Sequence, residues 1–333
     1  MRPSSPGPVA HDTPGPRAVE SPLRRACHWL WGQPHVLLVC TMLIWGANAV
    51  AARLAVGEIS PMVVTFLRWT VCCVALTLTS RREIAEHWHV LRPSWRYIVL
   101  MGALGFTGFN ALFYAAAHHT TAINIAIIQG TIPVFVLIGS LIVFGTRIGV
   151  LQVSGVFLTL AGIVVVASRG HPAVLARLDF NAGDVWMIVA CVLYAGYALG
   201  LRRRPAVPAV VFFAATAAVA ALVSLPLVAI EIARGQAFVP TPTGLLLVLF
   251  IGLLPSFVSQ LTFMQAVALI GPARAGMFMN LVPIFGPILA VLVLGEPLSA
   301  FHAVALALVL GGIFIAEHLG ARRHSTPSKP PTP

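Results

Sequence analysis

The sequence predicts an all-α integral membrane protein whose ten transmembrane helices form two inverted five-helix repeats. Three observations support this prediction. The chain is 58% hydrophobic and 9% charged, whereas ordinary soluble domains carry about 25% charged residues. Apolar runs of about 20 residues, long enough to cross the hydrocarbon core as helices, follow one another almost without interruption. Finally, the segment 102–167 recurs 150 positions later as 252–317.

The two copies of this segment align without a gap, and residues with special backbone or packing roles stay in register. Such agreement is hard to obtain by chance between two stretches that are merely hydrophobic, so it indicates a duplicated unit. The matched pairs include Gly102 with Gly252, Phe113 with Phe263, Pro133 with Pro283 and Gly145 with Gly295.

In chain order, residues 1–34 are rich in Pro, Ser, Gly and His and are predicted to form a disordered cytoplasmic arm. The first apolar run, 35–55, has no small-residue cleavage site and is expected to be retained as a helix. Further spans are predicted at 61–80, 96–117, 121–143, 148–168, 183–201, 207–230, 244–268, 271–294 and 299–319. The first repeat is then 35–168, followed by an extracytoplasmic linker at 169–182, the second repeat at 183–319 and a disordered cytoplasmic tail at 320–333.

Five helices per repeat make the two halves enter the membrane in opposite directions, a construction common among secondary transporters. With the N-terminus inside, 15 basic residues fall in predicted cytoplasmic segments and 4 in extracytoplasmic ones. Arg68 and Arg274, placed inside or at the edge of helices, are not counted. This bias predicts a multi-pass protein of the cell inner (plasma) membrane with both termini cytoplasmic. Orientation in the lipid bilayer, and not nucleic-acid binding, thus explains the net charge of +11.

Short motifs in both halves carry a resemblance to a known family. The chain resembles the EamA-type ten-helix members of the drug/metabolite transporter superfamily over about residues 36–318. The resemblance implies a central cavity between the repeats and movement of small metabolites by alternating access. The motifs are Ile44-Trp45-Gly46-Ala47-Asn48, Ser60-Pro61, Leu67-Arg68-Trp69, Leu281-Val282-Pro283, Leu294-Gly295-Glu296-Pro297-Leu298 and Gly311-Gly312.

The first repeat departs from this family pattern at one place. It has Gly145-Thr146-Arg147 where the family often has a Gly-Glu pair. Any role that the resemblance implies for this glutamate therefore rests on Glu296 alone.

Pro133 and Pro283 fall at matched positions in the middle of the fourth and ninth predicted helices. A proline inside a helix removes one hydrogen bond and clashes with the preceding turn, so both helices are expected to kink. Matched interruptions are a sequence pointer to a transport site. The kinks could equally serve helix packing without contacting a substrate.

Helices three and eight carry polar and aromatic residues on one face, because the i, i+3, i+4, i+7 spacing recurs in both repeats. Amides are costly in hydrocarbon and should point into the bundle. These residues could line the cavity, or the amides could act only as structural contacts between helices. The candidates are Asn110 and Phe113 in the first repeat and Ser256, Gln260 and Phe263 in the second.

Helices one and six overlay at a shift of 149, which pairs Trp45 with Tyr194 and Asn48 with Tyr197. Polar aromatic rings on inward faces suit a solute with an apolar body and a few hydrogen-bonding groups. Aromatic packing or an interfacial belt is the alternative interpretation.

Arg68 is the one strong charge predicted well inside a span, and such charges face the bundle interior or an aqueous cavity. It could attract an anionic group such as a carboxylate. Alternatively, the guanidinium could reach backbone carbonyls or the interface and be structural.

No Asp or Glu falls in the middle of a predicted span, so proton coupling has no support beyond Glu296 or a histidine. The sequence offers no catalytic, cofactor-binding or metal-ligand motif, and we expect neither an enzyme nor a cofactor. The favoured interpretation is a secondary transporter exporting an amino-acid-like or amphipathic small solute. A non-transporting scaffold and a multidrug efflux carrier are the alternatives, and homodimerisation stays open.

Overall fold

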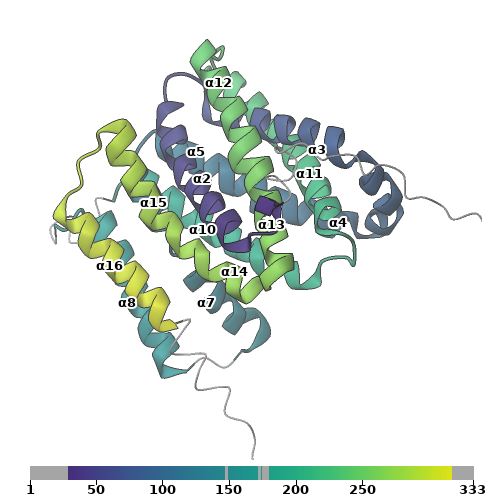
Figure 1. Ribbon diagram of the computed structural model, residues 1–333. Helices are drawn as coiled ribbons and strands as arrows, with labels where there is room; N and C mark the ends of the chain where they lie inside the picture. The colour runs from purple at the N-terminus through teal and green to yellow at the C-terminus, as the bar shows by residue number, and fades with distance from the viewer. Residues whose placement is uncertain (1–28, 147–148, 172–173, 175–179, 317–333) are drawn as a thin grey trace, which may run out of the picture.

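A computed structural model of the protein describes residues 29–146, 149–171, 174 and 180–316. Within these ranges every regular element is a helix and none is a strand (Figure 1). The protein is therefore an all-α membrane protein, as the sequence predicts. Residues 1–28 of the expected arm, the tail from residue 320 and half of the linker lie outside the described residues.

The first repeat supplies five spans, two of which contain more than one helical element. They are α2 (Pro34–Leu54); α3 (Pro61–Leu91); α4 (Trp95–Met101) with η2 (Gly102–Gly108) and α5 (Phe109–Ala117); α6 (Ala122–Gln129) with α7 (Ile132–Phe144); and α8 (Val150–Ala167).

The second repeat supplies the matching five spans. They are α10 (Ala182–Gly200); α11 (Ala209–Ala233); α12 (Pro242–Ile251) with η4 (Gly252–Val258) and α13 (Ser259–Ile270); α14 (Pro272–Met277) with η5 (Phe278–Leu281), α15 (Val282–Leu289) and η6 (Ala290–Leu294); and α16 (Ala300–Phe314).

Eight helical stretches of the described chain are long and apolar enough to cross a membrane, and α16 adds a shorter one. The stretch Pro61–Ala117 has 57 residues, more than twice the length of one crossing. The packing of α5 alongside α3 shows that the chain reverses direction at the short 3₁₀ turn Arg92–Ser94. The described residues thus provide ten crossings.

Helix α3 is longer than the sequence predicts, since it continues to Leu91 in place of ending near residue 80. Ser80 has non-helical backbone angles and marks a kink between the apolar span and a charged extension. The extension alternates charged residues such as Arg81 and Glu83 with apolar ones, and Leu91 is buried. An amphipathic segment of this kind keeps helical hydrogen bonds where a loop was expected.

The duplication is visible in the backbone. Elements η2 (102–108) and η4 (252–258) are both π-helical and occupy equivalent positions of the two repeats. The fourth and ninth spans both end at a glycine in the left-handed conformation, Gly145 (φ 61°) and Gly295 (φ 65°). Glycine is favoured there because it has no Cβ to clash at positive φ.

The main helix contacts between the repeats have an equivalent contact when the two repeats are exchanged. Helix α2 packs against α13 and α15, and its counterpart α10 packs against α5 and α7. The pairs α3 with α11 and α8 with α16 join equivalent helices of the two halves (Figure 1). In the last pair, Gly155 and Gly312 let the two backbones approach so closely that no added Cβ would fit.

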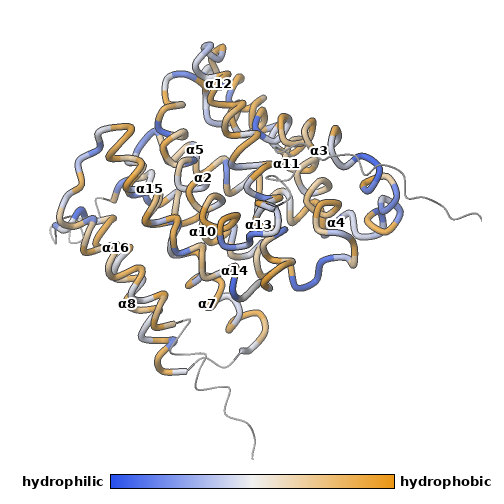
Figure 2. The backbone as a smooth tube through the Cα atoms, in the orientation of Figure 1, coloured by the Kyte–Doolittle hydropathy of each residue, from blue (hydrophilic) through white to orange (hydrophobic). Residues whose placement is uncertain are grey.

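Apolar residues dominate the tube throughout the spans, and hydrophilic residues gather near their ends (Figure 2). Large apolar side chains also face outward at equivalent positions, such as Ile142 (77% exposed) and Leu292 (75% exposed). Exposed apolar side chains of this kind fit contact with lipid.

Candidate functional site

A cavity lies between the two repeats, and both halves contribute to its wall. The empty space between its walls, with the open mouth included, measures about 810 Å³. Eight of the sequence-predicted residues line it: Trp45, Asn48, Arg68, Asn110, Pro133, Tyr194, Ser256 and Gln260.

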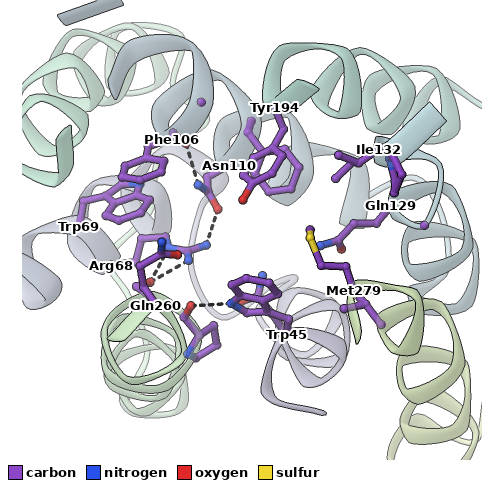
Figure 3. Close-up of a pocket in the computed structure, with 18 residues that line it drawn as sticks. Trp45, Arg68, Trp69, Phe106, Asn110, Gln129, Ile132, Tyr194, Gln260 and Met279 are labelled. Atoms are coloured by element: carbon purple, nitrogen blue, oxygen red, sulfur yellow. Dashed lines mark hydrogen bonds between the residues drawn. The ribbon is translucent and has the colours of Figure 1, made fainter. Parts of the chain in front are cut away.

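Arg68 of α3 is the charged centre of this cavity and is only 4% exposed. Its Nε and Nη2 donate to Ser256 Oγ of η4 at 3.0 and 2.7 Å. Its Nη1 donates to Asn110 Oδ1 (Figure 3), and it also donates to Tyr114 Oη at 2.6 Å. The guanidinium therefore joins the second, third and eighth spans across the boundary between the repeats.

Further hydrogen bonds fix the acceptors of Arg68 in place. Asn110 Nδ2 donates to the carbonyl of Phe106 at 2.7 Å, which turns Oδ1 toward the guanidinium. Tyr114 Oη donates to Asn48 Oδ1 of α2 at 3.1 Å. Ser256 Oγ donates to the carbonyl of Ile251 at 2.7 Å, five residues earlier in the π-helical turn. These acceptors are all neutral.

Aromatic rings make up much of the remaining wall. Trp69 and Phe106 stack with centroids 4.5 Å apart and an interplanar angle of 7°. Tyr194 lies against Phe109 at 5.2 Å. Trp45 Nε1 donates to the carbonyl of Pro255 at 3.2 Å, so the indole is held by the second repeat. The cavity thus combines a fixed cation with flat apolar faces.

The fourth and ninth spans are both interrupted beside the cavity. Gly130 and Thr131 separate α6 from α7, with Pro133 in the first turn of α7. In the ninth span a 3₁₀ turn precedes α15, whose first turn contains Pro283. The two breaks meet, because a Cβ at Gly130 would lie 2.8 Å from Pro283 Cγ.

Five predicted residues lie outside the cavity wall. Phe113 is fully buried against Phe109 and Tyr114, because its side of α5 faces the packed core and not the cavity. Tyr197 packs on Phe106 behind the wall, and Phe263 packs on Trp45. Pro283 faces Gly130, as described above, and Glu296 lies at the far end of the ninth span.

Glu296 belongs to a polar group at one end of the bundle, the cap cluster, which consists of Arg53, Thr120, Asn124, Asp184, Glu296 and His302. The Glu296 carboxylate accepts hydrogen bonds from the backbone N–H groups of Ala122 (2.9 Å) and Ile123 (3.0 Å), the first turn of α6. Arg53 Nε lies 3.9 Å from Glu296 Oε1. A carboxylate at a helix N-terminus is favoured by the unpaired N–H groups there.

The other half of the cap cluster is centred on Asp184, which is completely buried near the start of α10. Thr120 Oγ1 donates to Asp184 Oδ1 at 2.5 Å, and Asn124 Nδ2 does so at 3.2 Å. His302 Nε2 lies 3.2 Å from Asn124 Oδ1. The cluster therefore ties α6 to the sixth and tenth spans as well as the ninth.

His118 follows α5 beside the cap cluster and is half-buried. Burial lowers the pKa of its imidazole, and the neighbouring charges of His119 and Arg53 add to this effect. The neutral form is favoured at pH 7, so His118 adds no positive charge next to Arg53.

Three further groups matter in the structure. Trp69 and Gln129 line the cavity, and Tyr114 binds Arg68. In the sequence, Trp69 stands out only as part of a motif and Gln129 only as a weaker polar candidate, whereas Tyr114 has no signal of its own.

An all-helical bundle of two inverted repeats, with a cavity at their interface that holds a buried arginine, is typical of a membrane transporter. Residues 33–168 and 181–317 each match the EamA-like transporter family. The chain therefore belongs to this family.

Several transporters resemble the chain along most of its length. It is 26% identical over 285 residues to the uncharacterized transporter YyaM of Bacillus subtilis (85% of this chain, 93% of that protein). It is 27% identical over 322 residues to the probable terminal-alkyne amino-acid exporter of Streptantibioticus cattleyicolor (88% and 97%). The inner membrane transporter YedA of Escherichia coli, also uncharacterized, is 25% identical over 299 residues (88% and 92%).

One solved crystal structure superposes with a TM-score of 0.61 at 21% identity, covering 87% of this chain and 98% of that one. A likeness at this level of identity shows the fold alone.

Proposed function

We propose that this transporter exports a small amphipathic, amino-acid-like solute by alternating access through the cavity between the repeats. The observation that carries the proposal is the position of the cavity. It lies where the breaks of the fourth and ninth spans meet, and its wall holds a buried cation beside aromatic faces. Interrupted helices at a repeat interface are where secondary transporters bind their substrates.

The unequal packing of the two ends of the bundle supports alternating access. At the end that contains the cap cluster, all residues of α6 from Ala122 to Ile128 are buried. The equivalent helix α14 has one buried residue among its described side chains, Ala275, and η5 has none. The repeats thus hold one end closed, and exchanging their arrangements would close the other.

Charge distribution supports the orientation. Fifteen basic residues fall in segments assigned to the cytoplasm and four in those assigned outside, which favours cytoplasmic termini in a cell inner membrane. In this orientation the cap cluster closes the extracytoplasmic end. The open side then faces the cytoplasm, as an exporter awaiting its solute requires.

The solute class rests on two further observations. The aromatic wall formed by Trp45, Phe109 and Tyr194 suits an apolar body, and Arg68 with its amide and hydroxyl neighbours suits a polar head. A similar protein is named as a probable amino-acid exporter.

Comparative metabolite analysis of culture medium tests the proposal. Cells producing the protein are compared with cells producing Asn110→Ala/Gln260→Ala at equal membrane abundance. Gln236→Ala, at an exposed amide outside the cavity, is the matched control. We expect one class of solute to accumulate outside with the parent and the control but not with the double variant.

If no solute changes in the medium or in uptake assays, the transport proposal fails and a scaffold role gains support. Accumulation that persists in the double variant would instead keep the transport activity and remove this cavity face from it.

A further inference from the structure

The polar groups of the cavity gather on two facing sides. Arg68 and Trp69 lie on one side, while Gln129 points in from the other, next to Met279 (Figure 3). Trp45 and Tyr194 lie between these sides. One side carries a positive charge and an unpaired N–H donor, and the other side carries an unpaired acceptor.

The first side carries positive charge that the protein does not neutralise. Arg68 makes four hydrogen bonds to three neutral side chains, although a guanidinium offers five N–H donors. The ion pair found among the described residues, Arg53 with Glu296, lies in the cap cluster and not in the cavity. A buried charge without a counter-ion is costly, so an anion placed beside Arg68 would be strongly favoured.

An unused donor adds to this side. The indole Nε1 of Trp69 is buried and has no acceptor in the protein, although buried polar groups are nearly always paired. Trp69 directly follows Arg68 in the chain, and the guanidinium carbon lies 5.1 Å from its ring centroid. A cation and a free N–H donor thus stand together on one wall.

The opposite side carries an unused acceptor. Gln129 is the last residue of α6, immediately before the break at Gly130. Its Oε1 is buried and has no donor in the protein, while the residue lines the cavity. An acceptor in this state favours a solute that brings its own N–H group.

We propose that the cavity binds its solute through two polar groups, a carboxylate at Arg68 and an ammonium or amine N–H at Gln129. The apolar body then lies against Trp45 and Tyr194. This assigns the substrate class of amino acids and close relatives that carry both groups. The inference rests on the proposed function, because it names the solute of the same cavity.

Thermal unfolding of the purified protein with matched pools of compounds tests the inference without any mutation, since a ligand that binds only the folded state raises Tm. The pools are the L-amino acids, their primary amides and the matching carboxylic acids that lack the amino group, at equal concentrations. We expect the amino acids to raise Tm. Loss of either charged contact should weaken binding about 10- to 100-fold.

An equal rise in Tm from the amides would overturn the role of Arg68, and an equal rise from the acids without an amino group would overturn that of Gln129. No rise with any pool would overturn the assigned class. Export of a solute that lacks a carboxylate, measured as described above, would also overturn the inference while leaving the transport function intact.

Variants then assign each end of the solute. We expect Arg68→Gln to abolish the rise in Tm and Arg68→Lys to keep part of it. Arg202→Gln removes an arginine that lies over the ring of Phe144, outside the cavity. This control variant should leave the rise in Tm caused by amino acids unchanged. Gln129→Glu should strengthen binding of amino acids by adding an anionic acceptor, and Gln129→Leu should weaken it. A Gln129→Glu variant that binds more weakly would contradict an acceptor role.

Discussion

The first halves of the fourth and ninth spans are equivalent parts of the two repeats, yet they differ in burial and in helix length. Helix α6 is buried from Ala122 to Ile128. Its counterpart is a six-residue helix, α14, followed by the 3₁₀ turn η5 with no buried residue. Duplicated sequences have thus reached two different packing states in one molecule.

Two substitutions explain much of the difference. Glu296 accepts hydrogen bonds from the N–H groups of Ala122 and Ile123. The repeat equivalents of Glu296 and Ala122 are Thr146 and Pro272. Threonine lacks the carboxylate and proline has no N–H, so the equivalent cap at the start of α14 lacks the acceptor and one of the two donors. The comparison teaches that a few residue differences can make the two ends of a duplicated fold pack unequally.

The largest effect is expected from Gly286→Ala. A Cβ at Gly286 would overlap that of Ala126, where α15 crosses α6. Overpacking of this kind costs about 1–3 kcal/mol, so Tm in detergent should fall. A reporter cysteine at the buried position 122 (Ala122→Cys, in a cysteine-free background) should react faster with a maleimide when Gly286→Ala is also present.

Gly276→Ala is the matched control, because Gly276 is the repeat equivalent of Ala126. A Cβ there meets nothing within 4 Å, and alanine favours a helix over glycine by about 1 kcal/mol. We expect Tm to stay the same or rise slightly. Equal losses in the two glycine variants would contradict the unequal packing of the ends.

Removal of the carboxylate cap by Glu296→Ala should have the next largest effect. Two N–H groups of α6 lose their acceptors, and the loss of a cap costs about 0.5–2 kcal/mol. Labelling of Ala122→Cys should again increase. Glu58→Ala, which removes a carboxylate bonded to Thr241, is the control, and similar labelling in both variants would argue against a specific cap.

Introducing the equivalent cap at the start of α14 should favour closure of the end of the bundle at which α14 lies. Thr146→Glu alone should have a small effect because Pro272 offers no N–H, whereas Thr146→Glu/Pro272→Ala should stabilise closure of this end by about 1 kcal/mol. Maleimide labelling of Met277→Cys on α14, which is 43% exposed, should fall only in the double variant. If the effects of Thr146→Glu and Pro272→Ala on this labelling simply add, the two residues do not act as a pair.

The smallest effect is expected from Arg53→Gln. The Arg53–Glu296 ion pair is 3.9 Å long and the arginine is 34% exposed, so its contribution should be at most about 1 kcal/mol. Arg53 Nη1 also donates to the carbonyl of Ala117 at 2.5 Å. Labelling of Ala122→Cys should increase slightly and become less dependent on salt. A loss as large as that of Glu296→Ala would mean that the ion pair dominates the cap.

The sequence alone determined the membrane-spanning helices, the duplication and the burial of Arg68. Long apolar runs can satisfy their backbone groups in lipid only as helices, and a 150-residue repeat is visible without any contact. Matched prolines also marked the two spans that the structure interrupts. These features depend on local composition and spacing, which a sequence displays directly.

Tertiary packing decided which residues meet. Asn110 and Phe113 lie three positions apart on one helix, but only Asn110 reaches the cavity, because Phe113 is turned into the core. Asp184, Asn124 and His302 come from three separate spans and form one buried cluster. Helical periodicity gives a face but not the neighbour that the face meets, since that depends on how ten helices pack around one another.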